Sequence, residues 1–149
     1  MIKYTEENIF KSKAQALVNP VNGVGIMGKG LALEFKNRYP KMFQSYKDAC
    51  KEDRLKIGDL QVFNAGEILI INFPTKGDWK ESSDMNYIIS GLVTLKEHVI
   101  PENKIESISM PQIGCGLGGL DWNEVKAVIE KYLADVDTDI YVHIYKGAK

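Results

Sequence analysis

Two glycine-rich segments carry the strongest chemical signal in this sequence. The first glycine loop is Gly23-Val24-Gly25-Ile26-Met27-Gly28-Lys29-Gly30, and the second is Gly114-Cys115-Gly116-Leu117-Gly118-Gly119. Each follows an apolar, strand-like segment and precedes a helix-like one. Glycines let the backbone approach an anion closely, and the free N–H groups of a helix N-terminus supply donors. If both loops lie at the carboxyl ends of strands in one sheet, they can hold an elongated diphosphate between them.

The first glycine loop also fits two nucleotide-binding patterns in part. It contains GxGxxG, but a dinucleotide-binding loop directly follows the first strand of its fold, and no such loop follows the first strand predicted here, residues 2–4. It also satisfies the first seven positions of a Walker A loop, but Gly30 stands where a Ser or Thr is needed for magnesium. The loop therefore predicts phosphate binding without either of these two folds.

Polar side chains come just before the first glycine loop. In Asn19-Pro20-Val21-Asn22, the two asparagines follow the predicted strand 14–19, and an amide offers the donor and the acceptor that ribose hydroxyls require. The structural alternative is an Asx turn at Pro20. The sequence leaves both interpretations open.

Lys76 is the candidate for chemistry. It follows an apolar strand and lies in a Pro/Gly-containing loop close to Trp79. A lysine partly withdrawn from water can act as a nucleophile or base, and as a cation it can stabilise developing negative charge. A solvated surface lysine is the alternative. Cys115 is a weaker candidate, because no histidine is identified as its base. Asp121 lies three residues before Glu124 and is expected first to be the N-cap of the helix that follows it.

The elements that must position these residues alternate along the chain. Strands are predicted at residues 2–4, 14–19, 60–63, 68–73, 105–110 and 140–145. Helices are predicted at residues 28–39, from Pro40 onward, at 84–99 with a stop before Pro101, and after Asp121. This alternation predicts a three-layer α/β/α sandwich, and a hairpin over residues 60–73 makes its sheet mixed.

Composition sets further bounds. The 149 residues, 44% of them hydrophobic, predict one globular domain over residues 1–149. A net charge of -1 excludes a broad positive field for nucleic acid, although a local basic patch stays open. Two cysteines and two histidines without metal-ligand spacing predict neither a disulfide framework nor a metal site. The N-terminal segment lacks the apolar stretch of a signal peptide, so a cytoplasmic protein without membrane contact is expected.

Three segments of the chain form a recognisable set: residues 19–22, the first glycine loop with the segment that follows it, and Pro111-Gln112-Ile113 leading into the second glycine loop. Together they resemble the macrodomain family of ADP-ribose-binding modules. Two further segments, Asn72-Phe73-Pro74-Thr75-Lys76 and Gly118-Gly119-Leu120-Asp121-Trp122, are similar to those of DarG-type antitoxin macrodomains and of terminal ADP-ribose protein glycohydrolases. The resemblance covers essentially the whole chain. It implies the same three-layer fold with a mixed sheet.

The resemblance also implies a site. ADP-ribose would place its adenine near Asn8 and Ile9, its diphosphate between the glycine loops and its distal ribose near Asn22, Gly28 and Lys76. The predicted substrate-binding residues are Asn8, Ile9, Asn19, Asn22, Gly25, Ile26, Met27, Gly28, Gly30, Thr75, Gly114, Cys115, Gly116, Leu117, Gly118 and Gly119. Lys76 matches the catalytic lysine of the subclass. Gly118 stands where the protein glycohydrolase has an aspartate, and Asn8 stands where many macrodomains have an acidic residue.

The implied activity is that of an ADP-ribosyl hydrolase working without metal or cofactor. The most similar subclass removes ADP-ribose from a DNA base, thymidine, and has an ADP-ribosyltransferase toxin as partner. Three alternatives stay open: removal of ADP-ribose from acidic protein side chains, phosphatase action on ADP-ribose 1''-phosphate, and a reader that binds ADP-ribose without turnover. Lys76 separates the enzymes from the reader. A monomer is expected.

Overall fold

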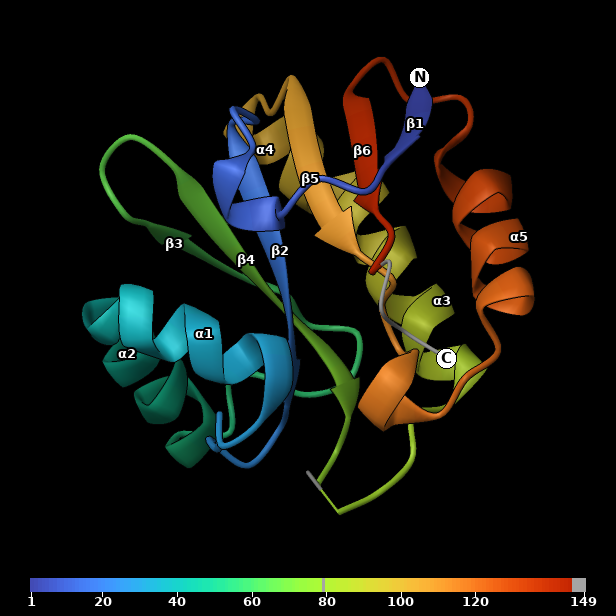
Figure 1. Cartoon of the computed structure of the whole chain (residues 1–149). Helices are drawn as coiled ribbons and strands as arrows, with labels where there is room; N and C mark the ends of the chain where they lie inside the picture. The colour runs from blue at the N-terminus through green and yellow to red at the C-terminus, as the bar shows by residue number, and fades with distance from the viewer. Residues whose placement is uncertain (79, 146–149) are drawn as a thin grey trace.

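One mixed sheet forms the centre of the molecule. The computed structural model describes residues 1–78 and 80–145. The strands are β1 (Ile2–Thr5), β2 (Ala16–Asn22), β3 (Gln61–Asn64), β4 (Leu69–Lys76), β5 (Ser107–Pro111) and β6 (Asp139–His143). They are arranged in the order β1-β6-β5-β2-β4-β3 (Figure 1). Only β3 runs antiparallel to its neighbour, which confirms the predicted hairpin and the mixed sheet.

Helices cover both faces of the sheet. They are α1 (Gly30–Arg38), α2 (Pro40–Lys51), α3 (Met85–Thr94), the π-helical η2 (Leu95–Val99), α4 (Ile100–Asn103) and α5 (Trp122–Leu133), with short 3-10 turns η1 (Ile9–Lys11) and η3 (Gly116–Gly118). As Figure 1 shows, α1 and α2 lie on one side of the sheet, and α3 and α5 lie on the other. The predicted three-layer α/β/α sandwich is confirmed.

Alternating side chains of the strands build a separate core on each face. In β2, Val18 packs with the residues of α3 and α5, whereas Leu17 packs with Phe35 of α1 and Met42 of α2. Successive strand residues point to opposite faces, so a buried central strand must be apolar on both. The layers approach closely at Gly91 of α3, where an added Cβ would overlap the Phe73 ring of β4.

Several predicted boundaries were wrong. β2 does not end at Asn19 but continues to Asn22, and β4 does not end at Phe73 but continues to Lys76. The third helix does not stop before Pro101, because the chain remains helical to Asn103. Proline has no N–H to donate to the carbonyl four residues earlier, and here the turn before it is π-helical, so the helix passes the proline without a break.

The topology brings the two glycine loops together. β2 and β5 are parallel neighbours, so the loops that follow them leave the same edge of the sheet. The first loop leads to α1 on one face, and the second leads to α5 on the other. Ligands of open α/β sheets bind where neighbouring connections diverge in this way.

Candidate functional site

The first glycine loop is shaped by the Asn22 side chain. Its Oδ1 accepts hydrogen bonds from the N–H groups of Val24 at 3.0 Å and Ile26 at 3.4 Å, and its Nδ2 donates to the Ile26 carbonyl at 2.7 Å. The Tyr46 hydroxyl of α2 lies 2.8 Å from Asn22 Oδ1. Burial raises the pKa of Tyr46, so its hydroxyl stays a donor. Asn22 thus folds the loop, a role that the sequence did not reveal.

The loop turns some residues outward and others into the core. The side chain of Met27, a predicted binding residue, is buried in the core beneath α1 and α2. Only its backbone can therefore contact a ligand. Gly25 is also buried, with a φ of 87° that favours glycine. Ile26, Gly28 and Gly30 are exposed. The outer surface of the loop therefore combines glycine backbone with the exposed residues Val24, Ile26 and Lys29.

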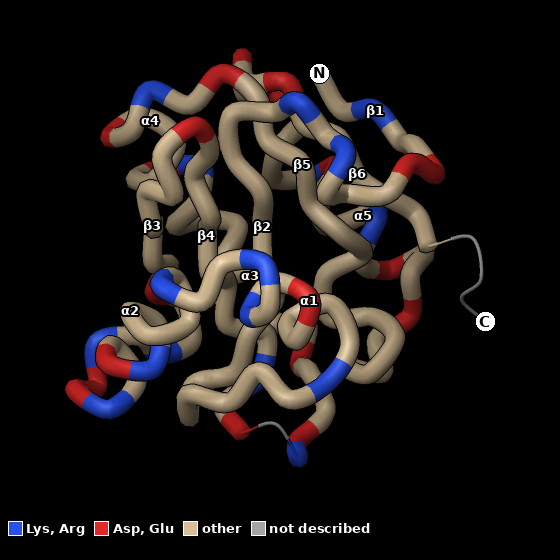
Figure 2. The backbone as a smooth tube through the Cα atoms, turned by 60° about the vertical axis from the view of Figure 1, so that its left-hand side comes forward, with Lys and Arg blue, Asp and Glu red and all other residues tan. Residues whose placement is uncertain are grey.

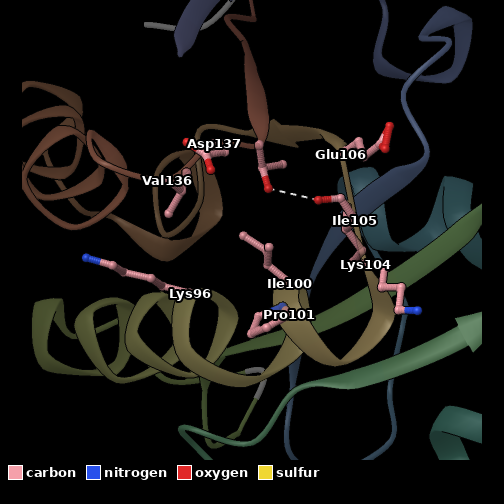
Figure 3. Close-up of a pocket in the computed structure, with 9 residues that line it drawn as sticks. Lys96, Ile100, Pro101, Lys104, Ile105, Glu106, Val136 and Asp137 are labelled. Carbon is pink, nitrogen blue, oxygen red and sulfur yellow. Dashed lines mark hydrogen bonds between the residues drawn. The ribbon is translucent and has the colours of Figure 1, made fainter.

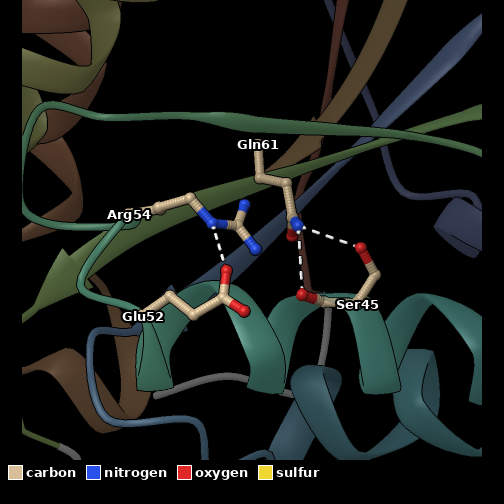
Figure 4. A network of polar contacts seen from close by, with 4 residues as sticks. All are labelled: Ser45, Glu52, Arg54 and Gln61. Atoms are coloured by element: carbon tan, nitrogen blue, oxygen red, sulfur yellow. Dashed lines mark hydrogen bonds and ion pairs between the residues drawn. The ribbon is translucent and has the colours of Figure 1, made fainter.

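Asn19 lies in a different place from the one predicted. It is inside β2 and fully buried, so it does not reach the loop surface as a ligand contact would require. Its Nδ2 donates to Asn72 Oδ1 at 3.0 Å, and Asn72 Nδ2 donates to Gln61 Oε1 at 2.9 Å. Gln61 in turn donates to Ser45 of α2, as Figure 4 shows beside the Arg54–Glu52 ion pair. This amide row, Asn19-Asn72-Gln61, joins three strands.

Lys76 is the last residue of β4 and lies level with Asn22. The register changes between Val21 and Asn22, because Thr75 is an extra residue on β4 and Lys76 pairs with Asn22. The predicted binding residue Thr75 is buried, and its hydroxyl lies 3.5 Å from the Val21 carbonyl. Bulges of this kind re-aim side chains next to active sites. Lys76 is half-buried, and Trp79, which the sequence placed near it, lies outside the described residues.

The segment after Lys76 is tied to the first glycine loop. Gly23 donates its N–H to the Gly77 carbonyl at 2.9 Å. An added Cβ at Gly23 would lie 3.2 Å from that same carbonyl oxygen. Two glycines therefore allow the end of β4 and the start of the loop to approach closely, which fixes the Lys76 backbone beside the loop.

The second glycine loop is held by a hydrogen bond across the loop and by a contact with Ser83. Leu120 donates its N–H to the Gly114 carbonyl at 2.9 Å across the loop. Gly114, Gly116 and Gly119 have φ values of 77°, 63° and 81°, which side chains rarely adopt. Gly114 is buried, whereas Gly116 and Gly119 are exposed.

Ser83 holds this loop at Gly118. Ser83 donates its N–H to the Gly118 carbonyl at 2.9 Å, and an added Cβ at Gly118 would lie 2.5 Å from Ser83 Oγ. That oxygen is buried and makes no hydrogen bond within residues 1–78 and 80–145. A side chain at position 118 would therefore meet Ser83.

The two loops meet at their tips. An added Cβ at Gly30 would lie 3.4 Å from Leu117 Cδ1, so the second loop touches the start of α1. Leu117 is 69% exposed and Ile26 is 43% exposed. Both loops thus present glycine backbone and an apolar side chain at one edge, as the spacing in the sequence predicts.

Cys115 is not poised for catalysis. Burial, with a contribution from the Asp121 charge, raises the pKa of its thiol to about 11, so the thiol stays protonated at neutral pH. Asp121 accepts a hydrogen bond from the Glu124 N–H at 3.2 Å and caps α5. The prediction that Asp121 caps this helix is confirmed.

The predicted adenine residues follow β1. Asn8 is exposed, and its side chain caps η1 by accepting from the Phe10 N–H at 2.8 Å, whereas Ile9 is buried. His143 of β6 joins this segment to the sheet, with Nδ1 2.8 Å from the Glu7 carbonyl and Nε2 2.8 Å from Ser109 Oγ. The histidine is thus buried, with a hydrogen-bond partner for each ring nitrogen.

A hollow also lies away from the glycine loops. Its volume is about 440 Å³, and it is lined by residues of η2, α4 and the segments that precede β5 and β6, including Lys96 and Lys104 (Figure 3). It lies at the amino ends of the strands, the edge opposite the glycine loops. Of the described residues, no three metal-ligating side chains cluster at either edge. The candidate site is therefore the backbone-lined junction of the two loops with Lys76.

No membrane-crossing element was found: within the described part of the chain, every helix is too short or too polar to span a bilayer.

The Gly118–Ser83 contact gives a testable prediction. If the ligand is the ADP-ribose that the resemblance implies, Gly118→Ala is expected to weaken its binding at least tenfold, or by ~1.4 kcal/mol, because the second loop must move away from Ser83. In the double variant Gly118→Ala/Ser83→Gly, affinity should return to within about threefold of the parent, or ~0.7 kcal/mol. Calorimetric titration with ADP-ribose measures both values. Equal affinity in the single variant would contradict the clamp.

Comparisons with known proteins agree with this geometry. The family model described as the Macro domain matches residues 18–129. The chain is 45% identical to the DNA ADP-ribosyl glycohydrolase of Mycobacterium tuberculosis over 148 residues, which are 95% of this chain and 42% of that protein. It therefore spans less than half the length of the curated relatives it matches first.

Solved structures are similar over the whole fold. The macrodomain of Mycobacterium tuberculosis DarG has a TM-score of 0.93 and 42% identity, with 96% of this chain and 97% of that chain covered. Thermosipho africanus DarTG in complex with ADP-ribose has a TM-score of 0.94 and 31% identity, with 99% of this chain and 42% of that chain covered.

Proposed function

This chain belongs to the macrodomain family, and from that premise we propose that it binds ADP-ribose and hydrolyses its bond to a DNA base, thymidine being the first candidate. A relative 45% identical is named a DNA ADP-ribosyl glycohydrolase, and the structural neighbour Thermosipho africanus DarTG is in complex with ADP-ribose. We further propose that residues 1–149 act as a single macrodomain.

The proposed ligand follows the two loops. The diphosphate lies between the first and second glycine loops, where exposed glycine backbone and the N-terminus of α1 supply N–H donors for negative charge. The adenine lies toward Asn8 and η1, and the distal ribose lies toward Lys76. The exposed side chains of Ile26 and Leu117 flank the diphosphate.

The proposed reaction takes place at the anomeric carbon of the distal ribose. Water adds its oxygen to that carbon, the bond from the carbon to the base breaks, and the base leaves with a proton. Lys76 acts at this carbon, either through its amine or through the positive charge of its ammonium. Gly118 offers no carboxylate for this step, so the lysine carries the greater part of the chemistry.

One observation favours a hydrolase over a reader. The bulge at Thr75 brings Lys76 level with Asn22, and the Gly23–Gly77 hydrogen bond holds this strand end against the phosphate-binding loop. A protein that only binds ADP-ribose needs no amine beside the distal ribose.

A parallel substrate assay tests the proposal. The purified protein is given ADP-ribosylated single-stranded DNA, protein ADP-ribosylated on glutamate, and ADP-ribose 1''-phosphate, and released ADP-ribose is quantified by chromatography. We expect release from DNA to be fastest. Faster release from glutamate or from the phosphate would transfer the assignment to that alternative, and binding without release from any substrate would establish a reader.

The partner and cellular setting belong to the same proposal. Thermosipho africanus has a relative named as a fusion of a DNA ADP-ribosyl transferase with a glycohydrolase, so we propose a transferase toxin as partner of this chain. A DNA substrate requires the compartment that holds DNA, which agrees with the expected cytoplasmic location. We propose that the protein is a monomer.

A further inference from the structure

Basic residues gather on the α1 and α2 side of the molecule. These two helices hold five basic residues, Lys36, Arg38, Lys41, Lys47 and Lys51, against only Glu34 and Asp48. The rest of the chain holds 14 basic and 18 acidic residues, so these two helices are locally basic in a chain of small net charge. Figure 2, in which this side comes forward, shows blue segments on both helices.

Three of these lysines form a row beside the first glycine loop. Lys47 and Lys51 are one helical turn apart on the exposed face of α2, and Lys36 of α1 lies with its ammonium 4.5 Å from the centre of the Phe43 ring. Phe43 is one turn before Lys47 and is partly exposed. We call Lys36, Lys47 and Lys51, with Phe43 between them, the lysine ridge.

The lysine ridge adjoins the candidate site directly. An added Cβ at Gly25 would lie 3.7 Å from Lys47 Cγ and 3.6 Å from Cys50 Cβ, so this part of α2 packs on the back of the loop. Val24, next in the loop, is 47% exposed. The lysine ridge therefore borders the first glycine loop, which forms one side of the candidate site.

The charges of the ridge are available to an external anion. Across residues 1–78 and 80–145, no carboxylate forms an ion pair with a ridge lysine, whereas the neighbouring Arg38, Arg54 and Lys56 each pair with an acidic residue. Lysines without ion-pair partners can contact the phosphates of single-stranded nucleic acid, and a partly exposed aromatic ring can stack on its unpaired bases.

We propose that the lysine ridge binds the phosphate backbone of the single-stranded DNA that flanks the ADP-ribosylated base. This inference rests on the proposed function. It gives the enzyme a preference for a modified base within a strand over the modified nucleoside alone, because only the strand reaches the ridge.

The test compares two substrates and two variants. The variant Lys47→Gln/Lys51→Gln removes two charges but retains the Cβ and Cγ atoms that pack on Gly25. For an ADP-ribosylated single-stranded oligonucleotide, kcat/KM should fall about tenfold at low salt. The slope of log kcat/KM against the logarithm of the salt concentration, measured between about 50 and 200 mM, is negative for the parent. In the variant this slope should be less negative by about 1.4, which is about 0.7 for each phosphate that a lysine no longer neutralises. For ADP-ribosylated thymidine, kcat/KM should change by less than about twofold, or ~0.4 kcal/mol.

A matched control lies on the other face of the sheet. Lys126→Gln/Lys131→Gln on α5 removes the same charge and should leave the rate and the salt dependence for the oligonucleotide unchanged. An unchanged rate in the α2 variant would overturn the inference, and so would an equal loss on oligonucleotide and nucleoside, which would mean that Lys47 acts through the loop.

A binding measurement separates this inference from the proposed function. Fluorescence anisotropy with an unmodified, labelled thymidine oligonucleotide should show salt-dependent binding that the α2 variant weakens, whatever the enzyme hydrolyses. If polyglutamate competes as well as the oligonucleotide at equal charge, the ridge is a general anion surface and the assignment to DNA fails.

Discussion

Lys76→Ala is expected to abolish release of ADP-ribose from DNA while leaving ADP-ribose affinity within about tenfold, or ~1.4 kcal/mol. Removing a group that acts only on the transition state lowers kcat without a matching loss of binding, and a loss of at least about a thousandfold, or ~4 kcal/mol, is expected for such a group. The rate is measured by single-turnover release of ADP-ribose, and the affinity by calorimetry.

Two further variants define what Lys76 does. Lys76→Arg keeps a positive charge but has no amine that can deprotonate, so retained activity would assign an electrostatic role and lost activity a nucleophile or base. Lys96→Ala is the control, because Lys96 pairs with Asp135 near the opposite edge of the sheet at 2.8 Å. Equal turnover by the alanine variant and the parent would remove Lys76 from the mechanism.

Gly91→Ala should lower the free energy of unfolding more than any other substitution considered for this protein. Its methyl group would overlap the Phe73 ring, and both groups are buried between α3 and β4. Overpacking at such a site costs about 3 kcal/mol, which lowers the melting temperature of a domain of this size by roughly 10 °C. Urea unfolding followed by circular dichroism gives the free energy of unfolding.

A compensating substitution tests the cause. Phe73→Leu alone should also destabilise, because it leaves unfilled volume. In Gly91→Ala/Phe73→Leu the methyl group finds room, so the double variant should be more stable than the sum of the two losses predicts. Strict additivity would show that the helix itself, and not the contact with Phe73, sets the cost.

The placement of the glycine loops could be predicted because it depends on local sequence. Strand, glycine run and helix follow one another in the chain, and their order places both loops at one sheet edge. The role of Lys76 needed the family resemblance, because a lysine after an apolar strand has no distinctive local pattern. The bulge at Thr75 that sets its position is invisible in the sequence, since it depends on how β4 pairs with β2.

The errors have a common physical origin. Asn19 and Asn22 look alike in sequence, yet one lies in a buried strand and the other folds the loop, and the difference depends on distant partners, Asn72 and Tyr46. Ser83 was missed for the same reason, because it is 35 residues from the glycine it holds. The helix across Pro101 was missed because a π-helical turn has no strong residue signature.

The row of amides across the sheet also bears on how the strands find their partners. A slip of one residue between β2 and β4 would turn Asn72 toward the opposite face, where the side chains from α3 and α5 are apolar. A buried amide without a hydrogen-bond partner costs about 1–3 kcal/mol. A misaligned sheet would therefore be less stable, because Asn72 and the amides it leaves behind would both lack partners. The amide row thus favours the observed alignment of β2 with β4, and because β4 ends in Lys76, it also favours the position of Lys76 beside Asn22.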